Sequence, residues 1–168
     1  QELDVIDTYP VEIIPGFLCV ATFLQSQAVR VIKDLKVKAN VIVGKQNDTI
    51  FAADGMTLGK DEKRVKQIVT IPIDDNGEED LYSHLSDIIH FIDGRTVLLS
   101  STLGISRSVA VVVAYYMWNK KVSRKGAYKH VKKCRENMQP TRGFIEQLSR
   151  WEEKMFGSIV TDISDPEY

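Results

Sequence analysis

Residues 98–108 read LLSSTLGISRS, an apolar run followed by two serines, a glycine, and an arginine between serines. This order predicts a buried strand, a tight turn and the first turn of a helix. Such a turn offers converging backbone N–H donors, and an arginine adds a fixed, bidentate positive charge. The segment from Thr102 to Arg107 is therefore a candidate loop for holding a phosphoryl group, with Gly104 allowing the chain to bend back.

Strand and helix patterns alternate along the chain before this loop. Apolar, β-branched runs predict strands at 11–14, 17–20, 39–43, 68–73 and 96–99. Apolar residues at helical spacing predict helices over 22–36 and 80–93, the second with Asp80 as a cap. Pro72 lacks an N–H, so the strand pairing is expected to end there. Residues 44–64 are polar and predict an exposed loop, in which 50–53 could form an edge strand.

Helical patterns alone follow the loop, over residues 108–120, 123–138 and 143–155. The apolar run 109–118 is rich in β-branched residues, yet its length predicts a helix that is buried on all sides. Strands alternating with helices, then helices alone, predict an α/β fold. We expect a central, mostly parallel sheet flanked by helices, with a helical C-terminal layer.

Length and charge limit the classes of protein that the chain can belong to. With 168 residues we expect one domain over 1–168, and the start at Gln1 suggests a domain excised from a longer protein. The 22 basic and 23 acidic residues give a net charge of −1, so no overall field favours nucleic acid. Two cysteines and three histidines argue against a structural metal site.

No apolar run reaches the roughly 20 residues that a membrane span needs. We therefore expect an intracellular, cytoplasmic protein without a membrane span, a nucleic-acid partner, a metal or a cofactor. An organelle address on an upstream segment stays open.

The residues Ser100–Ser108 resemble the His-Cys-x-x-Gly-x-Ser-Arg-Ser loop of the cysteine-dependent dual-specificity protein phosphatases. Residues 13–18 are similar to the family's opening strand pair, and 71–75 to the approach to its general-acid loop. Residues 140–148 resemble its Pro-Asn-x-x-Phe-x-x-Gln-Leu motif, with Thr141 in place of the asparagine. The resemblance implies the family fold, a general-acid position at Asp75, and a phosphate-binding loop made of Thr102, Leu103, Gly104, Ile105, Ser106 and Arg107.

Two positions depart from the family pattern. Ser101 stands where the nucleophilic cysteine belongs, and Ser100 stands where the family has histidine. With residues 128–134 and 165–168, these departures make the chain similar to the MAP-kinase-phosphatase-like branch of the serine/threonine/tyrosine-interacting pseudophosphatases. A helix N-terminus can lower a thiol pKa of about 8.5 to the neutral range, but a serine hydroxyl starts several units higher. Ser101 would need a neighbouring base.

The sequence offers no such base, because Ser100 cannot accept the proton and none of His84, His90 and His130 has a sequence position beside Ser101. We therefore expect a catalytically inactive protein in which Asp75 is a vestigial general acid. It would regulate signalling by binding phosphoproteins or active protein phosphatases.

Two alternative interpretations stay open. An active phosphatase could carry a substrate-trapping mutation, although a change of the nucleophile alone would leave histidine at position 100. A scaffold could have a loop that binds no phosphate. Short clusters also have simpler interpretations, since residues 74–77 could be only a turn, and the lysines and arginines of 120–135 could be solvated helix faces.

Overall fold

A computed structural model describes residues 9–44, 67–74, 76, 78–101 and 106–161 of the chain. Its described strands form one five-stranded sheet in the order β1-β2-β5-β3-β4. Only β1 and β2 are antiparallel, and the other neighbouring strands run parallel. The strands are β1 (Val11–Ile14), β2 (Leu18–Thr22), β3 (Ala39–Val43), β4 (Gln67–Ile71) and β5 (Val97–Ser101). The predicted α/β fold with a mostly parallel sheet is confirmed.

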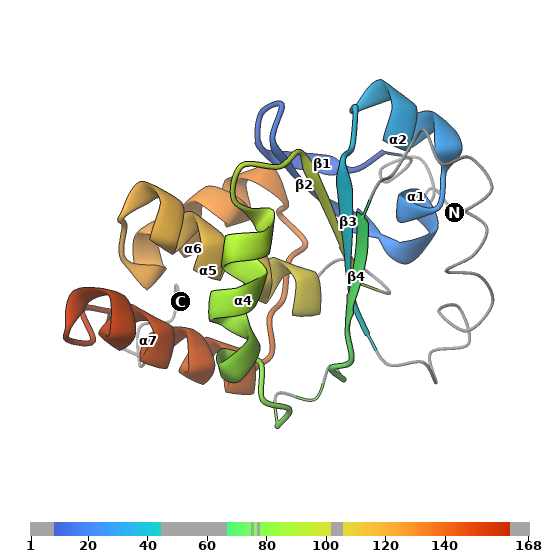
Figure 1. Cartoon of the computed structure of the whole chain (residues 1–168). Helices are drawn as coiled ribbons and strands as arrows, with labels where there is room; N and C mark the ends of the chain where they lie inside the picture. The colour runs from blue at the N-terminus through green and yellow to red at the C-terminus, as the bar shows by residue number, and fades with distance from the viewer. Residues whose placement is uncertain (1–8, 45–66, 75, 77, 102–105, 162–168) are drawn as a thin grey trace.

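Helices cover both faces of the sheet (Figure 1). A small core lies under α1 (Phe23–Ser26) and α2 (Val29–Asp34) on one face. The other face carries the larger core, and its helices are α4 (Tyr82–Ile92), α5 (Arg107–Lys120), α6 (Arg124–Cys134) and α7 (Arg142–Phe156). The predicted helical layer at the C-terminal side is therefore present.

The central helix α5 begins directly after the candidate loop. Each residue from Val109 to Tyr115 is fully buried, which explains why a β-branched sequence forms a helix here. Propensity differences are small per residue, whereas burial on all sides contributes much more to stability. The prediction of a buried helix over 109–118 holds, except that Tyr116 and Trp118 are half-buried.

Two helix predictions need correction. The helix expected over 22–36 is divided into α1 and α2, because Ala28 has extended backbone angles and separates them. Thr22 caps α1 in a capping box with Gln25, and such a box closes even a single turn. The helix expected over 123–138 ends at Cys134, after which the chain turns and buries Met138.

The remaining boundaries agree with the predictions to within two residues. Strand β4 ends immediately before Pro72, and Asp80 accepts a hydrogen bond from the Ser83 N–H at 3.0 Å as a cap of α4. That hydrogen bond is the main cause of a lowered pKa of the Asp80 carboxyl. Apart from Gly44, the predicted loop 44–64 with its edge strand 50–53 lies outside the described residues.

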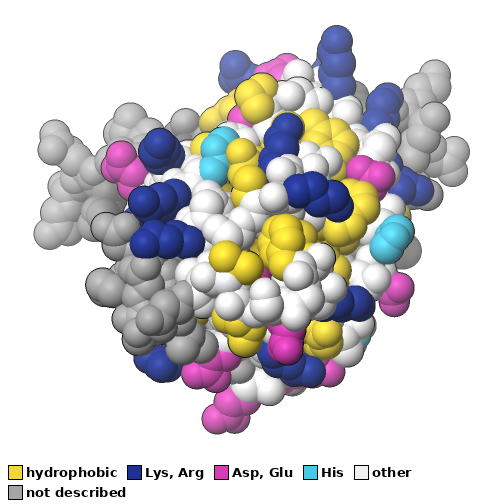
Figure 2. All heavy atoms as spheres, turned by 90° about the vertical axis from the view of Figure 1, so that its left-hand side faces the viewer, with side chains coloured by type: hydrophobic (Ala, Val, Ile, Leu, Met, Phe, Trp, Pro, Cys, Tyr) yellow, Lys and Arg dark blue, Asp and Glu magenta, His cyan; other side chains and the backbone are white. Residues whose placement is uncertain are grey.

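The basic residues of 120–135 are not all solvated, contrary to one of the interpretations above. Arg124 and Arg135 are buried, whereas Lys120, Lys129 and Lys133 are exposed. On the face with the helical layer, lysine and arginine side chains are spread between hydrophobic and other side chains (Figure 2). None of the helices that the structure describes is both long and apolar enough to cross a membrane.

Candidate functional site

The candidate loop leaves the sheet at the point where the chain changes direction. β2 connects to β3 through α1 and α2 on one face, whereas β4 connects to β5 through α4 on the other. β5 lies between β2 and β3, and its last residue, Ser101, pairs with Thr22 at the end of β2. In parallel α/β sheets, ligands bind beyond the carboxyl ends of the strands at such a point.

The serines on both sides of the loop are buried and hydrogen-bonded. The Ser101 and Ser108 hydroxyl oxygens are 2.9 Å apart, and the Ser108 N–H donates to Ser101 Oγ at 3.4 Å. Ser106 Oγ accepts a hydrogen bond from the Thr141 N–H at 3.3 Å. The structure therefore brings together the two ends of the predicted loop. Its middle residues, Thr102, Leu103, Gly104 and Ile105, lie outside the described residues.

Arg107 supplies a fixed positive charge at the start of α5. Its side chain is buried, and its Nη1 donates to the carbonyl oxygen of Ile73 at 3.1 Å, just beyond β4. The N-terminus of a helix also carries partial positive charge from its aligned peptide dipoles. The first turn of α5 therefore contributes both a charged side chain and a partial positive charge, and the N-terminus of a helix is a position where anions bind.

Ser100 and Ser101 point to opposite faces of the sheet, because successive side chains of a strand alternate. Ser100 pairs with Ala21 and Ile42 and lies on the side of α1 and α2, where its hydroxyl is fully buried without a partner among the described residues. It faces away from Ser101 and cannot take its proton. From the sequence, Ser100 was excluded as a base only because a serine hydroxyl does not accept the proton; the structure adds that it faces the wrong side of the sheet.

The histidines are engaged elsewhere. His130 Nε2 donates to the carbonyl oxygen of Ile13 at 2.9 Å, and the ring stacks on Tyr116 with 4.2 Å between centroids. His90 Nδ1 lies 2.6 Å from the carbonyl oxygen of Ser86, and His84 is exposed on α4. Within the described part of the chain, the Ser101 hydroxyl contacts Ser108 and has no histidine or carboxylate partner. The predicted acid position, Asp75, lies outside the described residues.

Neither cysteine is a replacement nucleophile. Burial, followed by the nearby Glu12 carboxylate, raises the pKa of Cys19 to about 12. Burial also raises the pKa of Cys134, which lies 3.7 Å from His130 Nε2 on the solvent side of the larger core. Because thiolate is the reactive form, both thiols are poor nucleophiles at neutral pH. In the described ranges, no cluster of His, Cys, Asp or Glu side chains is suited to hold a metal ion.

Helix α7 connects the loop with the segment that follows β4. Its Gln147 amide oxygen accepts hydrogen bonds from the Leu81 and Tyr82 N–H groups at 2.7 and 2.8 Å. The amide nitrogen donates to the Glu79 carbonyl oxygen at 2.8 Å. The sequence placed Gln147 in a family motif, but a glutamine within a helical pattern carries no signal of its distant partners.

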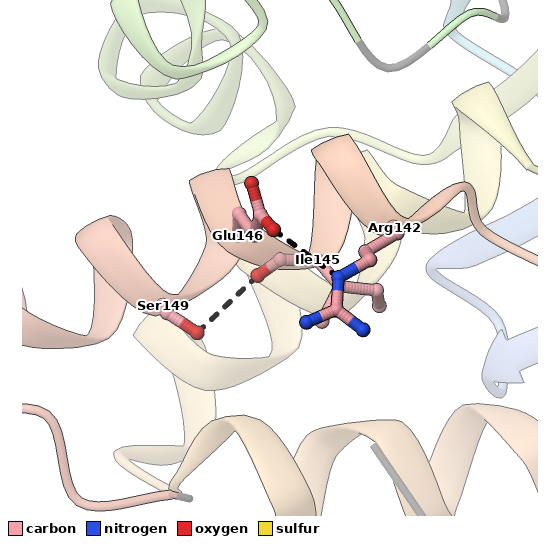
Figure 3. Close-up of polar contacts among 4 residues, drawn as sticks. All are labelled: Arg142, Ile145, Glu146 and Ser149. Atoms are coloured by element: carbon pink, nitrogen blue, oxygen red, sulfur yellow. Dashed lines mark hydrogen bonds and ion pairs between the residues drawn. The ribbon is translucent and has the colours of Figure 1, made fainter. Parts of the chain in front are cut away.

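The outer side of α7 is held less strongly. Arg142 Nε and Glu146 Oε1 are 3.3 Å apart on the solvent side, whereas the buried Ser149 hydroxyl donates to the Ile145 carbonyl oxygen within the helix (Figure 3). An exposed ion pair of this kind contributes at most about 1 kcal/mol. The position of α7 therefore depends mainly on its buried contacts, which include Phe144, Leu148 and the Trp151 N–H bond to the Ala114 carbonyl oxygen.

We expect Gln147→Ala to lower the free energy of unfolding by about 2 kcal/mol, because three backbone groups of residues 79–82 lose their partner. Urea denaturation followed by circular dichroism measures this change. Gln139→Ala is the matched control, since Gln139 is exposed. Equal stability of the two variants would contradict the role of Gln147 as an anchor for this segment.

Comparisons with known proteins agree with this geometry. A family model described as the catalytic domain of dual specificity phosphatases matches residues 17–154. Human dual specificity protein phosphatase 6 is 33% identical over 150 residues, which cover 86% of this chain and 37% of the relative. Drosophila melanogaster dual specificity protein phosphatase Mpk3 is 30% identical over 151 residues, which cover 87% of this chain and 34% of the relative. The chain thus spans little more than a third of the length of these two relatives.

Solved structures show the same architecture. Human DUSP28 superimposes with a TM-score of 0.71 at 27% identity, over 87% of this chain and 94% of that one. The human tyrosine phosphatase-like serine/threonine/tyrosine-interacting protein gives a TM-score of 0.76 at 24% identity, over 87% of this chain and 97% of that one. At 24% identity, the similarity to this second structure shows a shared fold and nothing more.

Proposed function

This chain belongs to the dual-specificity phosphatase family, and we propose that it binds phosphorylated protein segments without hydrolysing them. One observation carries the proposal: the hydroxyl of Ser101, at the end of β5, is paired with the hydroxyl and N–H of Ser108 and with no base in the described part of the chain. The protein then acts in signalling as a catalytically inactive binding module.

The chemistry of Ser101 supports the loss of turnover. A serine attacks phosphorus only when a base removes its proton, and neither the hydroxyl nor the N–H of Ser108 is a base. The start of α5 stabilises an anion, but the pKa of a hydroxyl lies too far above neutrality for this effect to produce an alkoxide. The buried Cys19 and the half-buried Cys134 lie in other places and do not replace it.

The surroundings of Ser101 still suit a bound phosphate. The Arg107 guanidinium and the N-terminus of α5 do not depend on a sulfur atom at position 101. A neutral hydroxyl also removes the negative charge that a thiolate would place against the phosphate. Repulsion between two unit charges 4 Å apart is about 4 kcal/mol at an effective dielectric constant of 20, so its removal favours binding.

We expect Arg107→Ala to weaken the binding of a phosphotyrosine peptide at least tenfold, because hydrogen bonds to a charged group contribute about 1.5–3 kcal/mol. Arg107→Lys should recover only part of the affinity, since a lysine lacks the planar fork. Isothermal titration calorimetry measures both. Arg30→Ala is the matched control, because Arg30 forms an exposed pair with Asp34 on α2.

Equal and weak binding by the unmodified chain and Arg107→Ala would contradict the proposal. It would favour the alternative of a scaffold whose loop binds no phosphate. Active protein phosphatases are the second class of partner, and a docked phosphatase needs no phosphate in the loop. Competition of such an enzyme with the phosphopeptide would therefore assign both partners to the same surface.

A further inference from the structure

A groove of about 340 Å³ lies between helix α4 and β4, the outermost described strand on this side of the sheet (Figure 1). Its floor is apolar and buried, formed by Val41, Ile71 and Ile88, and the half-buried side chains of Val69 and Phe91 extend it. This volume is within the range of small binding pockets, which are mostly apolar with a few polar groups. The groove is therefore large enough for one or two apolar side chains.

The backbone of β4 offers hydrogen-bonding groups beside this groove. β4 is the last strand of the sheet among the described residues, and its other side pairs with β3. The Ile71 carbonyl oxygen accepts the Gly44 N–H and so points toward β3. Since the backbone groups of successive residues alternate in direction, the N–H and C=O of Thr70 point outward. The Thr70 side chain is exposed, so a second chain can approach it.

Pro72 limits this edge. It is exposed directly after β4 and has no N–H, so any added strand pairs with five residues at most. Backbone pairing over so short an edge gives little affinity by itself. A bound strand therefore depends on side chains that enter the apolar groove, as in other cases of strand addition.

The charge around the groove selects the partner. Asp87 is exposed and is the only carboxylate among the described residues that line the groove, together with the polar side chains of Thr70 and His84. More acidic side chains follow at the end of β4, where the sequence holds Asp74, Glu78, Glu79 and Asp80. The complementary ligand carries a lysine or arginine beside its apolar residues.

We propose that this groove binds an extended segment of a partner protein, which adds to the edge of β4, places alternating apolar side chains in the groove and directs a basic side chain to Asp87. The site shares no lining residue with the described part of the phosphate loop, although Arg107 bonds the Ile73 carbonyl oxygen just beyond β4. Binding in the groove therefore needs no phosphate and does not depend on the function proposed above.

The test begins with selection from a displayed library of random peptides of about nine residues, long enough to span a five-residue strand. The selected sequences should combine apolar residues at alternating positions with lysine or arginine. The most enriched peptide is then synthesised, and its Kd is measured by fluorescence anisotropy. Saturating inorganic phosphate should leave this Kd unchanged, which separates the groove from the loop.

Two exposed substitutions locate the bound peptide. Thr70→Pro removes the outward N–H without breaking the β3 ladder, and we expect it to weaken binding about tenfold, with Thr70→Ser as the matched control. Asp87→Lys reverses the charge and should also weaken binding about tenfold, a change that Glu153→Lys, at an exposed position of α7, should not cause. Hydrogen exchange should show slower exchange of the Thr70 amide when the peptide is bound.

Three results would overturn the proposal. The first is a selection that enriches no peptide on the unmodified chain. The second is an enriched peptide that binds Thr70→Pro and the unmodified chain equally, which would exclude strand addition. The third is a peptide that loses affinity in saturating phosphate, which would place it in the loop instead.

Discussion

The Ser100→His, Ser101→Cys double variant is expected to hydrolyse a small aryl phosphate at least about 1,000-fold faster than the unmodified chain. The cysteine restores a nucleophile that the start of α5 can keep as a thiolate. Its sulfur would lie where Ser101 Oγ now lies, within reach of the Ser108 hydroxyl and N–H. Release of nitrophenolate from p-nitrophenyl phosphate measures the change.

Two further variants identify the source of the gain. Ser101→Cys alone should show part of it, because the thiol is the reactive group and the residue at position 100 faces the opposite side of the sheet. Adding Arg107→Ala to the double variant should return hydrolysis to the background, since the phosphate then loses its fixed positive charge. Comparable turnover by the unmodified chain and the double variant would contradict the proposed inactivity. An inactive double variant would instead favour the scaffold.

The largest expected effect on stability is at Glu152 in α7, where Glu152→Ala should lower the free energy of unfolding by about 3 kcal/mol. Its carboxylate is fully buried and accepts hydrogen bonds from the N–H groups of Arg124, Val160 and Thr161 and from the Thr161 hydroxyl. Thr161 also accepts the Lys125 N–H at 3.2 Å. One side chain thus joins α7, the start of α6 and residues 160–161.

Low pH should remove the stabilisation that the Glu152 carboxylate provides. Burial alone raises the pKa of Glu152, but the hydrogen bonds from Arg124, Thr161 and Val160 outweigh it and leave the pKa below the usual 4.5. A carboxyl whose pKa is lower in the folded state stabilises the fold above its unfolded pKa, and this stability is lost as the pH falls through the folded pKa. The free energy of unfolding should therefore decrease below about pH 4.5.

Urea denaturation between pH 7 and pH 3 measures both effects of Glu152. Glu153→Ala is the matched control, because its exposed carboxylate is adjacent in sequence and should change stability by less than about 0.5 kcal/mol. Glu152→Gln should remove the part of the pH dependence that this group causes. A Glu152→Ala variant as stable as Glu153→Ala would show that the buried carboxylate does not hold these segments together.

Much of the fold could be predicted from local patterns. The loop is bounded by an apolar strand and by a helix with an apolar run over 109–118, and the burial of Val109–Tyr115 agrees with that interpretation. The division between α1 and α2 could not be predicted, because apolar spacing continues across Ala28 and the break depends on its backbone angles. Pro72 did mark the end of β4, because a missing N–H is a property of the residue itself.

Long-range polar contacts could not be predicted from the sequence. Arg124 and Arg135 look like members of a solvated basic cluster, yet both are buried. Glu152 and Gln147 look like ordinary polar positions of an amphipathic helix, yet each bonds a backbone group far away in the chain, Glu152 that of Arg124 and Gln147 that of Leu81. Periodicity identifies the buried face of a helix but carries no information about which distant groups need a hydrogen-bond partner.

Ser100 and Ser101 are adjacent in the sequence but face opposite sides of the sheet, so one affects the stability of the fold and the other affects reactivity. Ser100 contacts the small core beneath α1 and α2, so substitutions there act on the folding equilibrium. Ser101 meets the start of α5, so substitutions there act on reactivity. In a double-mutant cycle over the two positions, most of the change in rate should therefore follow Ser101→Cys, and most of the change in stability should follow Ser100→His. Stability and hydrolysis thus depend on different residues of the same strand.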